Sequence, residues 1–286
     1  MRWKTGRRSQ NIEDRRGRRG RRRGLAGGGI GTLLLILAAL YFGIDPNIVL
    51  TGLETAGVNQ GPPSSAGPAD PAQDPQADFV AVVLGDTEDT WTQIFSQSGQ
   101  RYQQPRLVLF TDAVRSACGF ANAAVGPFYC PADTKIYLDL GFFRELRDRF
   151  QAPGDFAQAY VIAHEVGHHV QNLLGVSKAV RSQQQGRSKA QANALSVRQE
   201  LQADCFAGVW AQQANRARSI LESGDVEEGL NAASAIGDDR LQRQATGQVV
   251  PDSFTHGSST QRVRWFRKGL ESGDPGVCDT FSAANL

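Results

Sequence analysis

Apolar residues are distributed along this chain in three different ways. The stretch from Leu25 to Gly43 contains no charged residue, and it is just long enough for a helix that crosses a bilayer. Residues 54–77 are rich in Pro, Gly, Ser, Ala and Gln, and such a composition cannot bury enough surface to fold. Beyond them, large apolar side chains recur regularly. The pattern therefore predicts three parts: a transmembrane helix at 25–43, a flexible linker at 44–77 and one folded domain at 78–286.

Within the predicted domain, the spacing of apolar residues is first mixed and then mainly helical. Residues 79–95 have helical periodicity, whereas 106–110 and 135–140 are short and rich in β-formers, so we predict two strands, the second at the edge of the sheet. Asp155 is the expected N-cap of the first long helix. Start and stop signals predict helices at roughly 155–174, 190–213, 225–236 and 259–270. This order predicts an α+β fold with a small sheet and a mostly helical C-terminal part.

Charge is concentrated at the start of the chain. Residues 1–24 carry eleven Lys or Arg against Glu13 and Asp14, whereas the whole chain has a net charge of only +2. A basic segment of this kind can bind nucleic acid or anionic lipid. An apolar run follows, so the positive-inside rule predicts that residues 1–24 form a cytoplasmic tail. We therefore expect this tail to contact the membrane and not to bind nucleic acid. A cleaved signal peptide is the alternative, although no small-x-small cleavage site follows the run.

The four cysteines are even in number, which suggests two disulfides in an exported domain. Of the three possible connectivities we favour Cys118–Cys130, which closes a short loop, and Cys205–Cys278, which ties the C-terminus to the core. Buried free thiols are the alternative. A cysteine-ligated metal site is disfavoured because no pair has the two-residue spacing of a zinc knuckle.

Candidate chemistry is concentrated in the helix predicted at 155–174, which contains the sequence His164-Glu-Val-Gly-His168. Positions i and i+4 share one face of a helix, so both imidazoles can bind one metal ion. Glu165 is offset by one residue, which places its carboxylate beside a water on the metal, where a general base is needed. Gly167 is costly inside a helix, which suggests that another element packs closely there.

A catalytic zinc site usually takes three protein ligands and a water, so two histidines leave one ligand to be found. The second long helix supplies a candidate in Glu200, with Asp204 on the same face four residues later. Glu200 would bind the metal, and Asp204 would accept the outer N–H of a ligand imidazole and fix its tautomer. The alternative is a solvated acidic face, which the apolar residues of this helix disfavour because carboxylates that face a core need partners.

These residues resemble the gluzincin zinc peptidases, whose third ligand is the glutamate of a Glu-x-x-x-Asp helix. More narrowly, the chain is similar over nearly its whole length to the bacterial neutral zinc metallopeptidase family of YpfJ-like proteins. The segments that carry this resemblance are 11–16, the single apolar span, 126–131, 163–171, 200–205 and 256–259. The resemblance implies a zincin-like domain with one zinc ion per chain, bound by His164, His168 and Glu200, and with Glu165 as the base.

His256 and Arg262 lie six residues apart at the start of the last predicted helix. This spacing is similar to that in membrane prenyl-protein peptidases, where such a pair stabilises the oxyanion. The physical need exists because a tetrahedral intermediate carries negative charge that a positioned donor must offset. A loop histidine and a surface arginine are the alternative interpretation.

The sequence thus predicts a zinc peptidase anchored by a single pass in the bacterial cytoplasmic membrane. Its N-terminus would be cytoplasmic, and its extracytoplasmic domain would cleave a peptide or protein substrate. One alternative is a membrane-tethered binding domain with structural zinc, which Glu165 disfavours because a structural site needs no base. The other is a nucleic-acid-associated protein that uses the basic segment. The natural substrate and the oligomeric state stay open.

Overall fold

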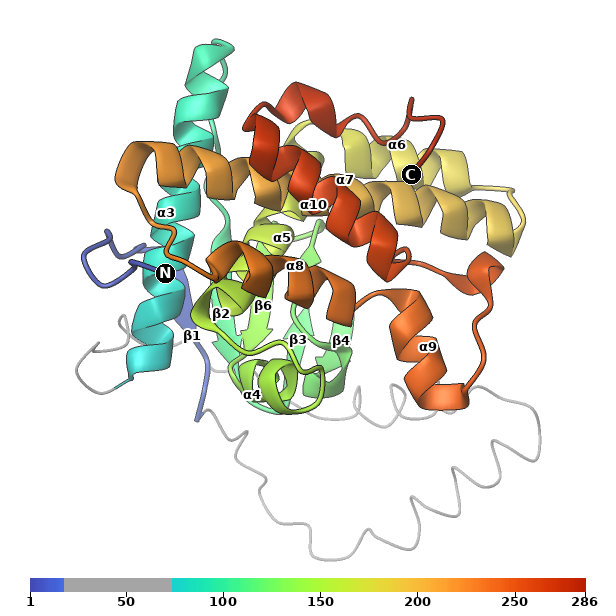
Figure 1. Ribbon diagram of the computed structural model, residues 1–286, viewed down its shortest axis with the longest axis horizontal. Helices are drawn as coiled ribbons and strands as arrows, with labels where there is room; N and C mark the ends of the chain where they lie inside the picture. The colour runs from blue at the N-terminus through green and yellow to red at the C-terminus, as the bar shows by residue number, and fades with distance from the viewer. Residues whose placement is uncertain (18–73) are drawn as a thin grey trace, which may run out of the picture. The chain divides into compact units, whose positions relative to one another are not determined.

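The computed structural model describes residues 1–17 and 74–286. The elements that carry the sheet and its hairpin are β1 (Ile12–Asp14), β2 (Arg106–Phe110), β3 (Ala113–Ser116), β4 (Gly119–Asn122), β5 (Phe128–Cys130) and β6 (Lys135–Asp139). The helices are α3 (Pro75–Gln97), α4 (Gly141–Asp148), α5 (Asp155–Leu173), α6 (Val176–Gln184), α7 (Lys189–Arg218), α8 (Asp225–Ala235), α9 (Asp238–Thr246) and α10 (Ser259–Ser272). The predicted α+β class, with a small sheet followed by helices, is confirmed (Figure 1).

The four-stranded sheet has the order β1-β2-β6-β5, with β5 antiparallel to β6 and the other neighbours parallel. Alternate residues of β2 point to opposite faces, as expected for a strand. Leu107 and Leu109 join the large core beneath α3 and α5, while Val108 and Phe110 pack under the β3–β4 hairpin. Strand β6, which the sequence placed at the edge, lies inside the sheet, and β5 is the edge strand instead.

The helical part is organised around α7, which packs against both α5 and α10. An added Cβ at Gly269 would lie 2.0 Å from the carbonyl oxygen of Cys205, so α7 and α10 approach backbone to backbone. The Cys205–Cys278 disulfide fastens the end of the chain to the same helix. Cys118 pairs with Cys130, which links the hairpin to β5. The structure therefore contains the connectivity that the sequence favoured.

The start of the metal-site helix differs in one detail from the prediction. Gly154 occupies the N-cap position with a φ of 114°, and Asp155 is the first helical residue. Glycine is suited to that backbone conformation, which other residues rarely adopt. The carboxylate of Glu228 accepts a hydrogen bond from the backbone N–H of Phe156 at 3.0 Å, so a carboxylate from α8 satisfies an N–H that the predicted cap would have satisfied.

Residues 1–16 are part of the folded domain, which corrects the predicted topology. Strand β1 pairs with β2, and Ile12 lies opposite Leu107. The Arg8 guanidinium donates to both carboxylate oxygens of Asp78 on α3, at 2.8 and 2.7 Å. Backbone pairing of this kind cannot form across a bilayer. The prediction that a cytoplasmic tail at 1–24 and the domain lie on opposite sides of a membrane is therefore wrong.

The predicted transmembrane helix at 25–43 and nearly all of the predicted linker at 44–77 lie outside the described residues. Within 1–17 and 74–286, none of the helices combines the length and the apolar character needed to span a membrane. The fold class is accordingly corrected to α+β without a membrane-spanning helix in those ranges. The folded domain begins slightly earlier than predicted, because α3 already starts at Pro75.

Glu88 on α3 binds three side chains of residues 1–11. Its carboxylate is fully buried in α3 and accepts hydrogen bonds from Ser9 Oγ at 2.6 Å, Asn11 Nδ2 at 2.7 Å and Arg7 Nη2 at 2.8 Å. All three donors come from the part of the chain that precedes β1. Without this segment, a charged group would be left buried and unpaired, which is costly.

We expect the double substitution Ser9→Ala, Asn11→Ala to lower the free energy of unfolding by about 3 kcal/mol, because hydrogen bonds to a buried charge contribute about 1.5–3 kcal/mol each. Chemical denaturation of the full chain measures this change. Arg2→Ala is the matched control, since Arg2 is exposed and its contact with Glu222 is long at 3.5 Å; its effect should stay within about 0.5 kcal/mol. An unchanged midpoint for the double variant would mean that the segment does not unfold with the domain.

Candidate metal centre

Two buried helices bring the candidate ligands together. His164 and His168 lie one turn apart on α5, with ring centroids 4.7 Å apart, and Glu200 projects toward them from α7. The helices come close at Gly167, where an added Cβ would lie 2.9 Å from the carbonyl oxygen of Ala203. Glycine at 167 therefore allows the backbone of α7 to approach the histidines, as the cost of a mid-helix glycine suggested.

The ligand atoms lie close enough together to bind one zinc ion. His164 Nε2 lies 3.2 Å from Glu200 Oε2, and His168 Nε2 lies 3.4 Å from Glu200 Oε1. A tetrahedron with metal–ligand bonds of 2.0–2.1 Å has edges of about 3.3 Å. In the described part of the chain, the group contains these three protein ligands and no fourth, and all three border one cleft. The donor set and its spacing fit zinc.

Each imidazole is oriented by a partner at its other nitrogen. His164 Nδ1 lies 2.8 Å from Asp204 Oδ1, the contact that the sequence predicted. His168 Nδ1 lies 2.9 Å from Gln171 Oε1. Both acceptors favour a proton on Nδ1, so each Nε2 lone pair is free to face a metal. Sequence analysis missed Gln171, although its position three residues after His168 on the same helix is a usable signal.

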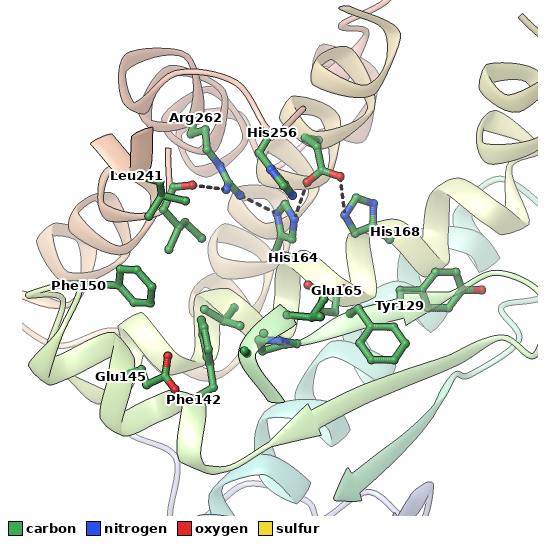
Figure 2. Close-up of a pocket in the computed structure, with 18 of the residues that line it drawn as sticks. Tyr129, Phe142, Glu145, Phe150, His164, Glu165, His168, Leu241, His256 and Arg262 are labelled. Atoms are coloured by element: carbon green, nitrogen blue, oxygen red, sulfur yellow. Dashed lines mark hydrogen bonds and ion pairs between the residues drawn. The ribbon is translucent and has the colours of Figure 1, made fainter. Parts of the chain in front are cut away.

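Asp204 belongs to a buried network that also contains Arg262 and Tyr160. The Arg262 guanidinium donates to Asp204 through Nε at 2.9 Å and through Nη2 at 2.8 Å. The hydroxyl of Tyr160 donates to the same carboxylate. Arg262 is only 2 % exposed and reaches the cleft wall beside His164 (Figure 2). The structure thus places Arg262 behind the first ligand, bonded to Asp204, and not at the open side where an oxyanion donor was expected.

The carboxylates make the centre strongly negative, and this favours positive charge on the histidines. Burial would by itself lower the pKa of His164, but the charge and hydrogen bond of Asp204, with the bond to Glu200, raise this pKa to about 10. Burial would likewise raise the pKa of Asp204, yet Arg262 and His164 hold it at about 2. Because a bound cation takes the place of such protons, the same electrostatics prepare the site for a divalent metal.

Glu165 borders the same cleft as the ligands and is 7 % exposed. Figure 2 shows it next to His164, on the side away from His256. The neighbouring His169 is turned into the core, where its ring nitrogens lie 2.6 Å from the carbonyl oxygen of Gln103 and 3.1 Å from the Tyr129 hydroxyl. The two ligands therefore share one helix face and the candidate base borders the same cleft from the adjacent position, while His169 serves packing.

His256 reaches the cleft from the loop before α10. Its Nδ1 lies 3.2 Å from Asp238 Oδ1, and the hydrogen bond to Asp238 is the main reason that its pKa is raised. Asp238 Oδ2 also accepts the backbone N–H groups of Thr255, His256 and Gly257, at 2.7, 2.6 and 3.0 Å. This one carboxylate fixes both the loop and the imidazole. Sequence analysis missed Asp238 because the contact joins the start of α9 to a distant loop and no local motif marks it.

The cleft has a volume of about 720 Å³, which is within the range of ligand pockets. Residues 124–129, including two residues of the edge strand β5, form one wall, and α5 and α7 provide the metal ligands. Tyr137 and Asp139 lie on β6 behind this strand. The site therefore combines a metal centre with an open strand edge.

Comparison with known proteins gives a consistent picture. Residues 1–281 match the model of the family described as "Putative neutral zinc metallopeptidase". Protein YpfJ of Escherichia coli strain K12 is 51% identical over 289 residues, covering 98% of this chain and 99% of YpfJ. A protein of Mycobacterium tuberculosis strain H37Rv is 47% identical over 195 residues, covering 65% of each chain. No solved structure is significantly similar.

Proposed function

We propose that this chain, which belongs to the neutral zinc metallopeptidase family, hydrolyses peptide bonds at the site formed by His164, His168 and Glu200. The observation that carries the proposal is the spacing of the two Nε2 atoms from the two Glu200 oxygens, at 3.2 and 3.4 Å, in the wall of an open cleft. A structural zinc site is normally closed by a fourth protein ligand. Three ligands beside a cleft leave a position for water and substrate.

The proposed mechanism assigns the proton transfers to Glu165. Zinc, when bound, supplies a Lewis acid that polarises the scissile carbonyl and lowers the pKa of a water. Glu165 takes a proton from the attacking water and passes it to the leaving amine. Glu165 is the only glutamate within the His164–His168 motif, so we assign both proton transfers to its carboxylate.

Two further residues support the reaction, one directly and one through a metal ligand. His256, held by Asp238 and half exposed to the cleft, donates a hydrogen bond to the developing oxyanion. Arg262 acts indirectly, because its two bonds to Asp204 keep that carboxylate aimed at His164. Arg262 is thus proposed as a positioning residue, and the oxyanion role remains with His256.

The edge strand β5 is the proposed binding site for the substrate backbone. It pairs with β6 on one side only, and Phe128 and Tyr129 line the cleft. An extended peptide can add to such an edge through backbone hydrogen bonds. A peptide paired with β5 would lie in the cleft that the metal ligands border. This arrangement supports a peptide or protein as the substrate class.

Replacing His256 by alanine should lower kcat by about a hundred- to thousandfold, because a lost oxyanion donor has that effect in other hydrolases. Zinc content and KM should change little, since His256 is not a ligand. His256→Gln keeps an N–H donor and should retain more activity than His256→Ala. Steady-state kinetics with metal analysis of both variants test this role, and full activity of the alanine variant would rule it out.

The proposed function is tested by incubating the purified full chain with an unbiased peptide library and identifying the products by mass spectrometry. Peptide cleavage that a chelator stops and added zinc restores is the expected result. A zinc-loaded chain that cleaves no peptide would instead favour the alternative, a domain that binds a partner without catalysis.

A further inference from the structure

Part of the cleft wall beside the metal ligands is apolar. On the His164 side this wall contains five large apolar side chains: Phe142, Phe150, Val161, Ile236 and Leu241. Figure 2 shows Phe142, Phe150 and Leu241 together on this side, whereas Tyr129 lies on the other side beside His168. We call these five residues the apolar subsite.

The apolar subsite lies next to the reacting centre. Val161 and His164 are three residues apart on α5 and therefore share a face. Phe150 and Val161 are 8 % and 4 % exposed. They are packed into the core and form the floor of the subsite. Because Val161 is only about one helical turn from His164, a substrate side chain that packs against it lies close to the bond being cleaved.

The charged side chains at this end of the cleft lie at its rim or are buried and paired. Glu145 on α4 and Arg149, the residue after this helix, form a long ion pair, with Glu145 Oε2 3.7 Å from Arg149 Nη1, and both side chains are largely exposed at the rim. Arg262 is held by Asp204. A charged substrate side chain that packs against the apolar subsite would therefore lose hydration without gaining a buried partner, and burial of such a group is unfavourable.

We propose that the apolar subsite selects substrates with a large apolar residue, such as leucine or phenylalanine, next to the scissile bond. This inference rests on the proposed peptidase function and specifies its substrate class. Full burial of such a side chain corresponds to about a ten- to hundredfold preference over a charged residue at the same position. Leu241 is the residue through which this selectivity can be altered most simply, because it is partly exposed on α9, whose outer residues face solvent.

The test uses N-acylated aminoacyl hydroxamates of leucine, phenylalanine, lysine and aspartate, which bind zinc and place one side chain beside it without requiring catalysis. Dissociation constants for the zinc-loaded full chain should be at least about tenfold lower for the leucine and phenylalanine compounds than for the other two. Leu241→Glu should reduce the leucine-to-lysine preference by at least about tenfold. Leu174→Glu is the matched control, because Leu174 is an exposed leucine that does not border the cleft, and it should leave the preference unchanged.

The possible failures are distinguishable. Equal affinity for all four hydroxamates, or an unchanged preference in Leu241→Glu, would overturn the apolar subsite even if peptides are cleaved. Selective binding by a chain that cleaves no peptide would support the subsite and contradict the proposed catalysis. Absence of binding by every hydroxamate would overturn both.

Discussion

Glu165→Gln should reduce peptide hydrolysis by about a hundred- to ten-thousandfold, the range that a general base contributes, and should leave the zinc content unchanged. Glutamine has nearly the same shape but cannot accept and return a proton. The side chain borders the cleft beside His164 and is not one of the three ligands. Loss of turnover with retained metal would therefore separate the role of base from that of ligand.

Glu145→Gln is the matched control for this experiment, because Glu145 borders the same cleft but belongs to α4 and pairs with Arg149. Its turnover should stay close to that of the unchanged chain. Single-turnover kinetics on a cleaved library peptide, with metal analysis of each protein, provide the comparison. Retained turnover in Glu165→Gln would remove Glu165 as the base.

Glu200→Ala should abolish stable zinc binding. The two Glu200 oxygens approach both imidazoles and their charge raises the pKa of His168, although burial would by itself lower it. Without this carboxylate, two neutral imidazoles would hold a doubly charged ion, and one of the three protein ligands would be missing. The loss should exceed the approximately 10- to 100-fold that removal of an outer hydrogen-bond partner costs.

A graded series makes the effect of Glu200 interpretable. Gln171→Ala removes the partner of His168 Nδ1 and should weaken zinc binding by about 10- to 100-fold. Glu227→Ala, an exposed glutamate on α8, should have no effect. Competition with a chromophoric chelator measures all three affinities, and zinc held equally by Glu200→Ala and Glu227→Ala would exclude Glu200 as a ligand.

The candidate ligands could be predicted because their geometry is local. The i, i+4 spacing within α5 and within α7 determines which side chains share a face, and Gly167 indicated that another element lies close. The spacing did not reveal the contacts that residues outside these two helices make. Arg262 illustrates this, because its distance from His256 in the sequence suggested the cleft, whereas the buried charge of Asp204 holds it behind His164.

The N-terminal segment shows a different limit of sequence analysis. A run of arginines before an apolar stretch is typical of a membrane-flanking tail, and composition does not reveal which carboxylates lie nearby in space. The structure pairs Arg8 with Asp78 and surrounds buried Glu88 with donors from Ser9 and Asn11. Strands as short as β1 and β5 also cannot produce a periodic pattern, so the edge of the sheet was assigned to β6.

The central claim is that the centre formed by His164, His168 and Glu200 is a catalytic zinc site. The most direct measurement is a titration of the metal-depleted full chain with zinc, in which bound metal and cleavage of one library peptide are followed together. Our account predicts that activity rises in proportion to bound zinc and reaches its maximum at about one ion per chain, as expected for three ligands and one open position. Saturation with zinc without any cleavage, or cleavage that persists in the metal-depleted chain, would contradict it.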